Sequence, residues 1–211
     1  MFQIRVCQNP DCGLRYPVVD DSKFGDRCPA CLGQTKVVSE QPIIQQQEPV
    51  NHPFSNGLQI SVVLDNLRSG LNVGSIFRSA DGFGFQHIYI CGITPSPENT
   101  EVRKSAIDSE QFIEWSSHKN ALDLINTLKG KGHEIWALEK TANSIPIRSA
   151  GIDTEKTHPL LLVVGNEVTG IDPDILETAD RLVYLPMGGQ KRSFNVAVAF
   201  ALAAQILRSS I

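Results

Sequence analysis

Four cysteines near the start of the chain have the spacing of a metal site. They form two close pairs, Cys7-x4-Cys12 and Cys28-x2-Cys31, with 15 residues between the pairs. Turn-forming residues within each pair direct the thiolates toward one point, which suits the tetrahedral coordination of structural zinc. The alternative is four unrelated buried thiols. The fifth cysteine, Cys91, stands alone in an apolar run and is typical of a thiol packed in the core.

Polar residues later in the chain could contact a small ligand. The first group lies between Asn72 and Gly84, where Arg78 follows Asn72 by six residues. Asn72 is in position to cap a helix, because its side chain can accept a hydrogen bond from a backbone N–H of the first turn. An arginine among apolar helix residues usually pairs with a carboxylate or a phosphate. The alternative is a surface arginine whose stem covers apolar neighbours.

Two further polar groups have the same character. In residues 165–170 two glycines enclose Glu167, which either contacts a ligand or caps a nearby helix. Residues 185–195 form a loop with two glycines that ends in Ser193, a predicted helix N-cap, and Asn195. Neither group has the G-x-G-x-x-G pattern, which argues against a dinucleotide-dependent dehydrogenase.

Each polar group follows an apolar segment that predicts a buried strand. Runs that are apolar at every position suit strands covered on both faces, so the pattern predicts an α/β fold with a parallel sheet and helices on both faces. The polar groups are expected at the carboxyl edge of that sheet, where such folds bind ligands. Predicted strands span residues 60–64, 87–91, 134–138, 160–164 and 182–185, and predicted helices span residues 73–83, 119–128 and 196–207.

Composition and charge fit an ordinary globular protein. Of the 211 residues, 41% are hydrophobic and 20% are charged, and the net charge of −4 gives no overall basic signature. No apolar run approaches the roughly 20 residues of a membrane span, and the N-terminus lacks the features of a signal peptide. We therefore expect a cytoplasmic protein without membrane association, in which cysteines bind metal rather than form disulfides.

The chain divides into three parts by composition. Residues 1–40 hold the four paired cysteines and are a predicted zinc-ribbon module, whose folding free energy would come from the metal. Residues 41–57 are rich in proline and glutamine, have no apolar period and are a predicted linker. Residues 58–211 carry the α/β pattern and are long enough for one core.

The three polar groups, taken in order, resemble the motifs of the SpoU/TrmH family of RNA 2′-O-ribose methyltransferases, of the SPOUT class. The resemblance covers residues 58–211. Two departures are visible: Phe194 replaces the usual leucine or methionine, and the loop at residues 66–70 lacks the usual proline. The matching segments are Asn72-x5-Arg78, Gly165-Asn-Glu-x2-Gly170, and Leu185-Pro-Met through Ser193-x-Asn195.

This resemblance implies a C-terminal trefoil knot, one of the few exceptions to the rule that chains do not knot. It implies S-adenosyl-L-methionine as methyl donor, a homodimer through the C-terminal helix, which is apolar on nearly all sides, and tRNA or rRNA as substrate. The cofactor would be held mainly by backbone groups. The implied cofactor-binding residues are Gly165, Leu185, Met187 and Phe194.

The family's catalytic residues also map onto this chain. The residue matching Arg78 is the proposed activating base in the family, so we expect Arg78 to position or deprotonate the ribose hydroxyl. Glu167 and Asn72 would hold Arg78 and the nucleotide. Ser193 and Asn195 would bind a substrate phosphate or brace the loop.

Two alternatives concern the role of each part. A non-catalytic RNA-binding module that retains the fold is the rival interpretation. The joint presence of Asn72, Arg78, Glu167, Ser193 and Asn195 argues against it. The N-terminal module either stabilises the fold, docks RNA or binds a protein partner. Residues 1–57 carry five basic and six acidic side chains and so have no basic excess. We favour RNA docking, because a polar linker would uncouple a purely structural module.

Overall fold

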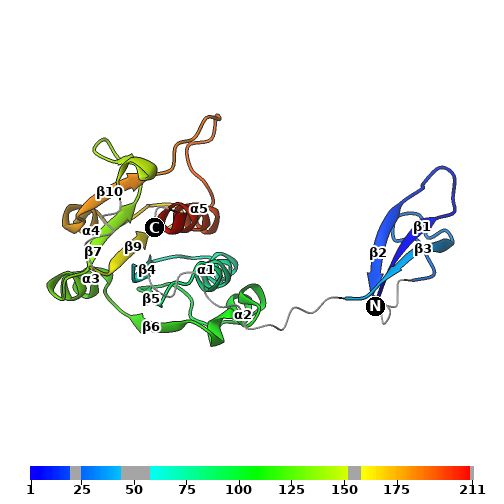
Figure 1. Ribbon diagram of the computed structural model, residues 1–211, viewed down its shortest axis with the longest axis horizontal. Helices are drawn as coiled ribbons and strands as arrows, with labels where there is room; N and C mark the ends of the chain where they lie inside the picture. Colours follow the sequence, from blue (N-terminus) through cyan, green and yellow to red (C-terminus); the bar gives the residue numbers. More distant parts are fainter. Residues whose placement is uncertain (20–24, 44–57, 152–157, 210–211) are drawn as a thin grey trace. The chain divides into compact units, whose positions relative to one another are not determined.

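The computed structural model divides the chain into two compact units, Met1–Asn51 and His52–Ile211 (Figure 1). The described residues are 1–19, 25–43, 58–151 and 158–209. Most of the predicted linker, residues 44–57, lies outside them. Its first predicted residue, Gln41, is still part of a strand, and the ends of the linker stay a prediction.

The N-terminal unit is a small antiparallel sheet with the strand order β2-β1-β3. Strand β1 spans Phe2–Cys7, β2 spans Arg15–Val19 and β3 spans Thr35–Gln41. The sequence predicted no strands here, because the sheet buries little: five of the seven residues of β3 are exposed. Without a buried face, the apolar alternation that marks a strand is absent.

The C-terminal unit is built on a parallel sheet, which has seven strands within the described residues. Their order is β6-β5-β4-β9-β7-β10-β8, and every neighbouring pair is parallel. All residues of β4 and β9, near the centre, are buried, which explains their apolar sequences. The strands are β4 Ile60–Asp65, β5 His87–Cys91, β6 Glu114–His118, β7 Glu134–Leu138, β8 Ile145–Pro146, β9 Leu160–Val164 and β10 Arg181–Tyr184.

Helices cover both faces of this sheet (Figure 1). Helices α1, α2 and α5 pack on one face, and α3 and α4 pack on the other. The predicted α/β class is therefore confirmed, whereas the knot stays a prediction. The helices are α1 Gly70–Gly82, α2 Thr100–Ala106, α3 Ala121–Gly130, α4 Pro173–Thr178 and α5 Val196–Ser209, with 3-10 turns at Ser109–Gln111 and Ile147–Ser149.

In the C-terminal unit, the predicted strands and α-helices do not include α2, α4, β6 and β8. Strand β6 lies at the edge of the sheet, and none of its residues is buried, so its sequence carries no apolar pattern. Strand β8 has only two residues, and α2 has seven residues of which two are buried. Segments this short and this exposed give no periodic signal. The five predicted strands are present as β4, β5, β7, β9 and β10, with β10 starting one residue earlier than predicted.

The predicted cap of α1 is wrong. The helix begins at Gly70, and Ser69 caps it by accepting a hydrogen bond from the Asn72 N–H at 3.3 Å. Both side chains can cap a helix, and the backbone path of the loop decides between them. Asn72 consequently lies in the first turn, with its side chain directed to other partners.

The predicted cap of α5 is also wrong. Asn195 caps this helix instead of Ser193, because its Oδ1 accepts from the N–H groups of Ala197 and Val198 at 3.0 and 3.3 Å. Asn195 thus has a structural role that the sequence pattern assigned to its neighbour. Its amide group retains two N–H donors for another contact.

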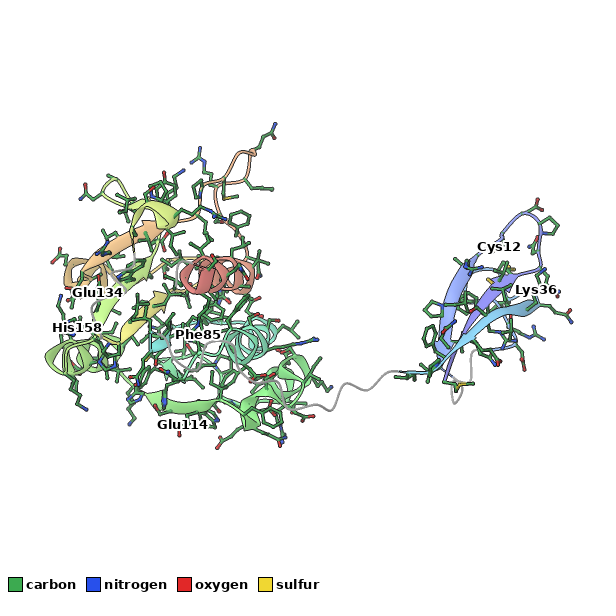
Figure 2. All side chains as sticks on the ribbon, in the orientation of Figure 1. Cys12, Lys36, Phe85, Glu114, Glu134 and His158 are labelled. Atoms are coloured by element: carbon green, nitrogen blue, oxygen red, sulfur yellow. The ribbon has the colours of Figure 1, made fainter. Side chains whose placement is uncertain are left out.

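Helix α5 closes the core on the α1 side of the sheet. The ring of Phe200 meets that of Phe85 edge-on, with centroids 5.1 Å apart, and Figure 2 labels Phe85 close to this helix. The side chain of Arg208 is almost fully buried, and burial lowers its pKa. The Arg208 guanidinium donates to three backbone carbonyls, those of Leu58, Phe83 and Gly84.

None of the helices in the described part of the chain has the length and apolar character needed to cross a bilayer.

Two glycines of α1 provide a matched test of the helix packing. A Cβ at Gly74 would lie 2.8 Å from the Ala106 backbone nitrogen and closer still to atoms of Ser105 and Val102, whereas a Cβ at Gly82 would meet nothing within 4 Å. We expect Gly74→Ala to lower the free energy of unfolding by about 1–3 kcal/mol, because α1 and α2 must separate. Gly82→Ala should change it by less than about 1 kcal/mol. Urea denaturation of both variants measures the difference, and equal stabilities would contradict this packing.

Candidate active site

A cavity of about 470 Å³ opens at the carboxyl edge of the sheet. Its walls come from residues 138–140 after β7, residues 164–170 after β9, and residues between 184 and 199 that lead from β10 into α5. The sequence predicted a site at this edge. The second and third polar groups line the cavity, whereas residues 72–84 of the first group do not. All four predicted cofactor-binding residues, Gly165, Leu185, Met187 and Phe194, line the cavity. Their contact with a cofactor stays a prediction.

The wall after β9 is a tight turn that depends on Gly165. Asn166 and Gly170 exchange two backbone hydrogen bonds, of 3.1 and 2.9 Å, which fold the turn back on itself. A Cβ on Gly165 would lie 2.5 Å from the Gly170 carbonyl carbon, so a larger residue would push the turn open. The Asn166 side chain also donates to the Asn66 carbonyl at 2.7 Å and ties the turn to the loop after β4.

Glu167 projects from this turn and holds the start of α1. Its carboxylate accepts from the N–H groups of Arg68 and Ser69 at 2.9 and 3.2 Å and from the Asn72 side-chain amide at 2.9 Å. Partial burial opposes its ionisation, but the hydrogen bonds from Asn72 and the two backbone groups outweigh burial, so the pKa of Glu167 lies below its usual value. The alternative that Glu167 caps the nearby helix α4 is wrong, because Asp172 caps α4 itself.

Asn72 joins Glu167 to Asn195. The Asn72 Nδ2 donates to Glu167, and its Oδ1 accepts from the Asn195 Nδ2, each at 2.9 Å. One residue from each of the three predicted motifs therefore takes part in a single hydrogen-bonded chain. We call Glu167, Asn72 and Asn195 the polar triad. In the sequence, Glu167 lies 95 residues after Asn72, and Asn195 lies 123 residues after it.

The remaining two predicted catalytic residues are placed differently. Ser193 is exposed and lines the cavity. Arg78 is exposed on α1 and does not line it. Six residues of an α-helix correspond to a rotation of about 600°, which places Arg78 about 120° around the helix from Asn72. The carboxylate of Glu167 bonds to the start of α1 rather than to Arg78, so the predicted Glu167–Arg78 contact is not observed in this chain.

Sequence reasoning missed Glu139 and Asp65. Glu139 follows β7 and lines the cavity. Asp65 ends β4, is 2% exposed and accepts from the Asp172 N–H at 3.2 Å; burial raises the pKa of its carboxyl group. In each case the sequence shows only a single acidic residue at the end of an apolar strand. Such residues are common at sheet edges, so this signal does not identify a site residue.

The four cysteines of the N-terminal unit converge as predicted. The Sγ atoms of Cys7, Cys12, Cys28 and Cys31 all lie within 4.8 Å of one another, and Figure 2 labels Cys12. Two of the distances are 3.4 Å and 3.7 Å, whereas zinc–sulfur bonds of about 2.3 Å give a tetrahedral S–S separation of about 3.8 Å. The Gly33 N–H lowers the pKa of Cys31 to about 7, whereas burial and the neighbouring cysteines raise the pKa of Cys7 to about 12. The four thiol groups therefore fit a structural zinc ion.

Cys91 is fully buried in the C-terminal unit, and burial raises the pKa of its thiol to about 12. A thiol with this pKa is inert at neutral pH. The predicted core role of Cys91 is confirmed.

The cavity lies at the carboxyl edge of a parallel sheet, which is where α/β domains of this kind bind ligands. The chain belongs to the SpoU rRNA Methylase family, which it matches over residues 59–205. This match covers the seven described strands of the parallel sheet, the cavity and the polar triad.

Similar proteins support the family assignment. The chain is 29% identical over 143 residues to the tRNA (guanosine(18)-2′-O)-methyltransferase of Escherichia coli (strain K12), over 68% of this chain and 60% of the relative. It is 29% identical over 147 residues to the 23S rRNA (guanosine(2553)-2′-O)-methyltransferase of Bacillus subtilis (strain 168), over 70% and 57% of the two chains. The chain thus spans about 60% of the length of these curated relatives.

Solved structures show the same fold. The AdoMet-bound rRNA methyltransferase of Sinorhizobium meliloti superimposes with a TM-score of 0.66 and 29% identity, over 72% of this chain and 57% of that one. The A. aeolicus TrmH/SpoU tRNA modifying enzyme superimposes with a TM-score of 0.64 and 26% identity, over 72% and 75% of the two chains. The shared region corresponds in extent to the C-terminal unit.

Proposed function

We propose that this protein is an S-adenosylmethionine-dependent methyltransferase that acts on a ribose 2′-hydroxyl of cytoplasmic tRNA or rRNA. The observation that carries the proposal is the polar triad, which joins the three motifs beside one cavity. The names of the curated relatives supply the reaction class, and the S. meliloti structure supplies the cofactor.

The cavity suits this cofactor in size and in lining. Ligand sites commonly measure about 300–1,000 Å³ and combine apolar walls with a few polar groups. Backbone groups of Gly165, Leu185 and Phe194 are proposed to hold S-adenosylmethionine, with Met187 alongside. The bound cofactor would supply a sulfonium methyl group, to which the ribose oxygen bonds as the sulfur–carbon bond breaks. Ser193 and the polar triad would orient the nucleotide at the cavity. The C-terminal helix α5 is proposed to thread through a loop and so form the trefoil knot.

Arg78 can reach a cavity through dimerisation. Helix α1 packs against α5, and both helices expose apolar side chains, among them Leu71 at 58%, Val198 at 48% and Leu202 at 41% exposure. We propose that these side chains are covered by a second copy of the chain. The exposed face of α1 that carries Arg78 would then approach the cavity of the other subunit. The ribose hydroxyl's proton would leave to a water molecule that Arg78 orients, because a protonated guanidinium has no site that can accept it.

The dimer makes a direct prediction. The double variant Val198→Glu, Leu202→Glu is expected to be a monomer at micromolar concentration, because it places two charges in an apolar interface. The wild type should sediment as a dimer. Phe112→Glu, which changes a side chain that is 76% exposed elsewhere in the unit, is the control and should stay dimeric. Sedimentation equilibrium distinguishes these states, and a monomeric wild type would exclude the interface.

The activity itself is tested in two steps. Isothermal titration calorimetry with S-adenosylmethionine measures cofactor binding, and mass spectrometry of RNA from cells with and without the protein locates a 2′-O-methylated nucleotide. The proposal expects both binding and one lost modification in tRNA or rRNA. Binding of RNA without cofactor binding or methylation would instead indicate a non-catalytic module.

The N-terminal unit is proposed to dock RNA. In the register of its sheet, Arg15 and Lys36 flank Val6 on either side, so their side chains share one face. Both are exposed. Arg5 is less available, because its guanidinium donates to Thr35 and Gln3. Lys23, another basic side chain of this unit, and Phe24, which could stack on a base, lie outside the described residues. Two cations on one face of a zinc-held sheet could contact backbone phosphates.

A further inference from the structure

Glu139 is an acidic side chain held in the wall of the cavity. It follows β7 directly and lines the same space as Gly165 and Leu185. Its two oxygens accept long backbone hydrogen bonds, 3.3 Å from the Lys140 N–H and 3.4 Å from the Ile171 N–H. An ionised carboxylate offers about four acceptor positions, so half of its capacity remains for a ligand.

The turn after β9 fits closely around this carboxylate. Gly170 has a φ of +75°, and a Cβ at this position would lie 2.7 Å from the Glu139 Oε2. A glycine therefore serves two purposes here: it adopts the left-handed conformation, and it leaves room for the acid. The turn contacts the carboxylate on one side, and the cavity opens on the other. The Glu139 side chain is therefore partly buried, and the turn limits the positions that its carboxylate can take.

The chemistry of the cavity indicates which ligand group the acid would meet. In parallel α/β folds that bind nucleotides, a carboxylate near a strand end accepts from ribose hydroxyls. Two vicinal hydroxyls offer two O–H donors with a spacing that matches two carboxylate oxygens. The neighbouring wall residues Leu138, Val164 and Ala199 are apolar and suit a base rather than a charged group.

We propose that Glu139 is a cofactor-binding residue that accepts hydrogen bonds from the 2′- and 3′-hydroxyls of the ribose of S-adenosylmethionine. This assignment rests on the proposed function, because it names one contact of the proposed cofactor. It adds a side chain to a site otherwise assigned to backbone groups. It also gives the cavity a means to select adenosine ligands with an intact ribose.

The test pairs a change in the protein with a change in the ligand. Calorimetry compares wild type, Glu139→Gln and Glu139→Ala with three probes: S-adenosylmethionine, 5′-methylthioadenosine and 2′,3′-dideoxy-5′-methylthioadenosine. Wild type should bind methylthioadenosine about 10-fold or more tightly than its dideoxy form, since the hydrogen bonds involve a charged acceptor. Both variants should lose most of this difference, so the two changes should be non-additive.

Controls separate this contact from a loss of fold. Glutamine keeps one oxygen that can accept from the Ile171 N–H, so Glu139→Gln should melt at the temperature of wild type. Glu177→Ala removes an exposed acid on α4 and should retain the full preference for the diol.

Each outcome decides the assignment. Retention of the full diol preference by the Glu139 variants would overturn it. Weaker binding of S-adenosylmethionine alone, with unchanged binding of methylthioadenosine, would also overturn it, because the acid would then contact the amino-acid part of the cofactor. A wild type that binds none of the three probes would overturn the proposed function and this contact with it.

Discussion

Replacing Arg78 by alanine is expected to lower the rate of methyl transfer by about 10²–10⁴-fold while leaving the affinity for S-adenosylmethionine unchanged. Arg78 does not line the cavity, so its removal is expected to leave the proposed cofactor site intact. Lysine should not restore the rate, because an ammonium group cannot reproduce the planar guanidinium. Arg103→Ala, which removes an exposed arginine on α2, is the control and should keep wild-type activity. Near-normal turnover by Arg78→Ala would show that another residue acts on the hydroxyl.

A mixing experiment shows which subunit supplies Arg78. Gly165→Ala should disable the cavity of its own protomer, because the added Cβ would lie 2.5 Å from the Gly170 carbonyl carbon. If Arg78 acts on the partner's cavity, a heterodimer of Arg78→Ala and Gly165→Ala has one intact site. Co-expression of the two inactive variants should then restore about one quarter of wild-type activity, for random pairing of subunits. No recovery in heterodimers isolated with two different affinity tags would place Arg78 in its own protomer's site.

Removal of zinc is expected to unfold the N-terminal sheet and leave the C-terminal unit folded. Structural zinc contributes an apparent binding free energy of about 10–16 kcal/mol, which a sheet with so few buried residues cannot replace. NMR spectra before and after chelation should lose the dispersed signals of residues 1–43 only. Cofactor affinity should not change, whereas RNA affinity and its salt dependence should both fall.

A double variant separates the role of charge from that of folding. Arg15→Ala, Lys36→Ala should keep its zinc and its sheet but weaken RNA binding, with a salt slope reduced by about 2 if each cation contacts one phosphate. Lys119→Ala, Lys131→Ala is a charge-matched control in the C-terminal unit, where both residues are exposed. RNA binding that survives both chelation and the charge variant would indicate that the N-terminal unit binds a protein partner.

Local patterns predicted the parts of the fold that depend on burial. Strands β4 and β9 were recognisable because all their residues are buried, and the paired cysteines because four thiols of that spacing suit one metal. The edge strand β6 was missed because none of its residues is buried. Apolar periodicity arises where one face of an element packs on a core, so an exposed element at the edge of a sheet does not show it.

Contacts between loops distant in sequence were not predictable in the same way. The Asn72–Glu167 hydrogen bond needs α1 to start at Gly70, and the pattern placed that start three residues later. The resemblance indicated that these residues share a site, but the partner of each side chain depends on the backbone path. Glu139 had no local signal, because a single acid after a strand is common.

The anchoring of α5 by Arg208 has a consequence for how the protein is made. A ribosome delivers the chain from its N-terminus, so strands β4 to β10 emerge before Phe200 and Arg208 are available. Until then this face of the core, which includes Phe85, lacks the part of its cover that α5 provides, and the carbonyls of Leu58, Phe83 and Gly84 lack the guanidinium. A nascent chain stalled before α5 should therefore expose an apolar face and bind chaperones, and release of the helix should end that dependence. The core can therefore be completed only after the ribosome has added Arg208, close to the end of the domain.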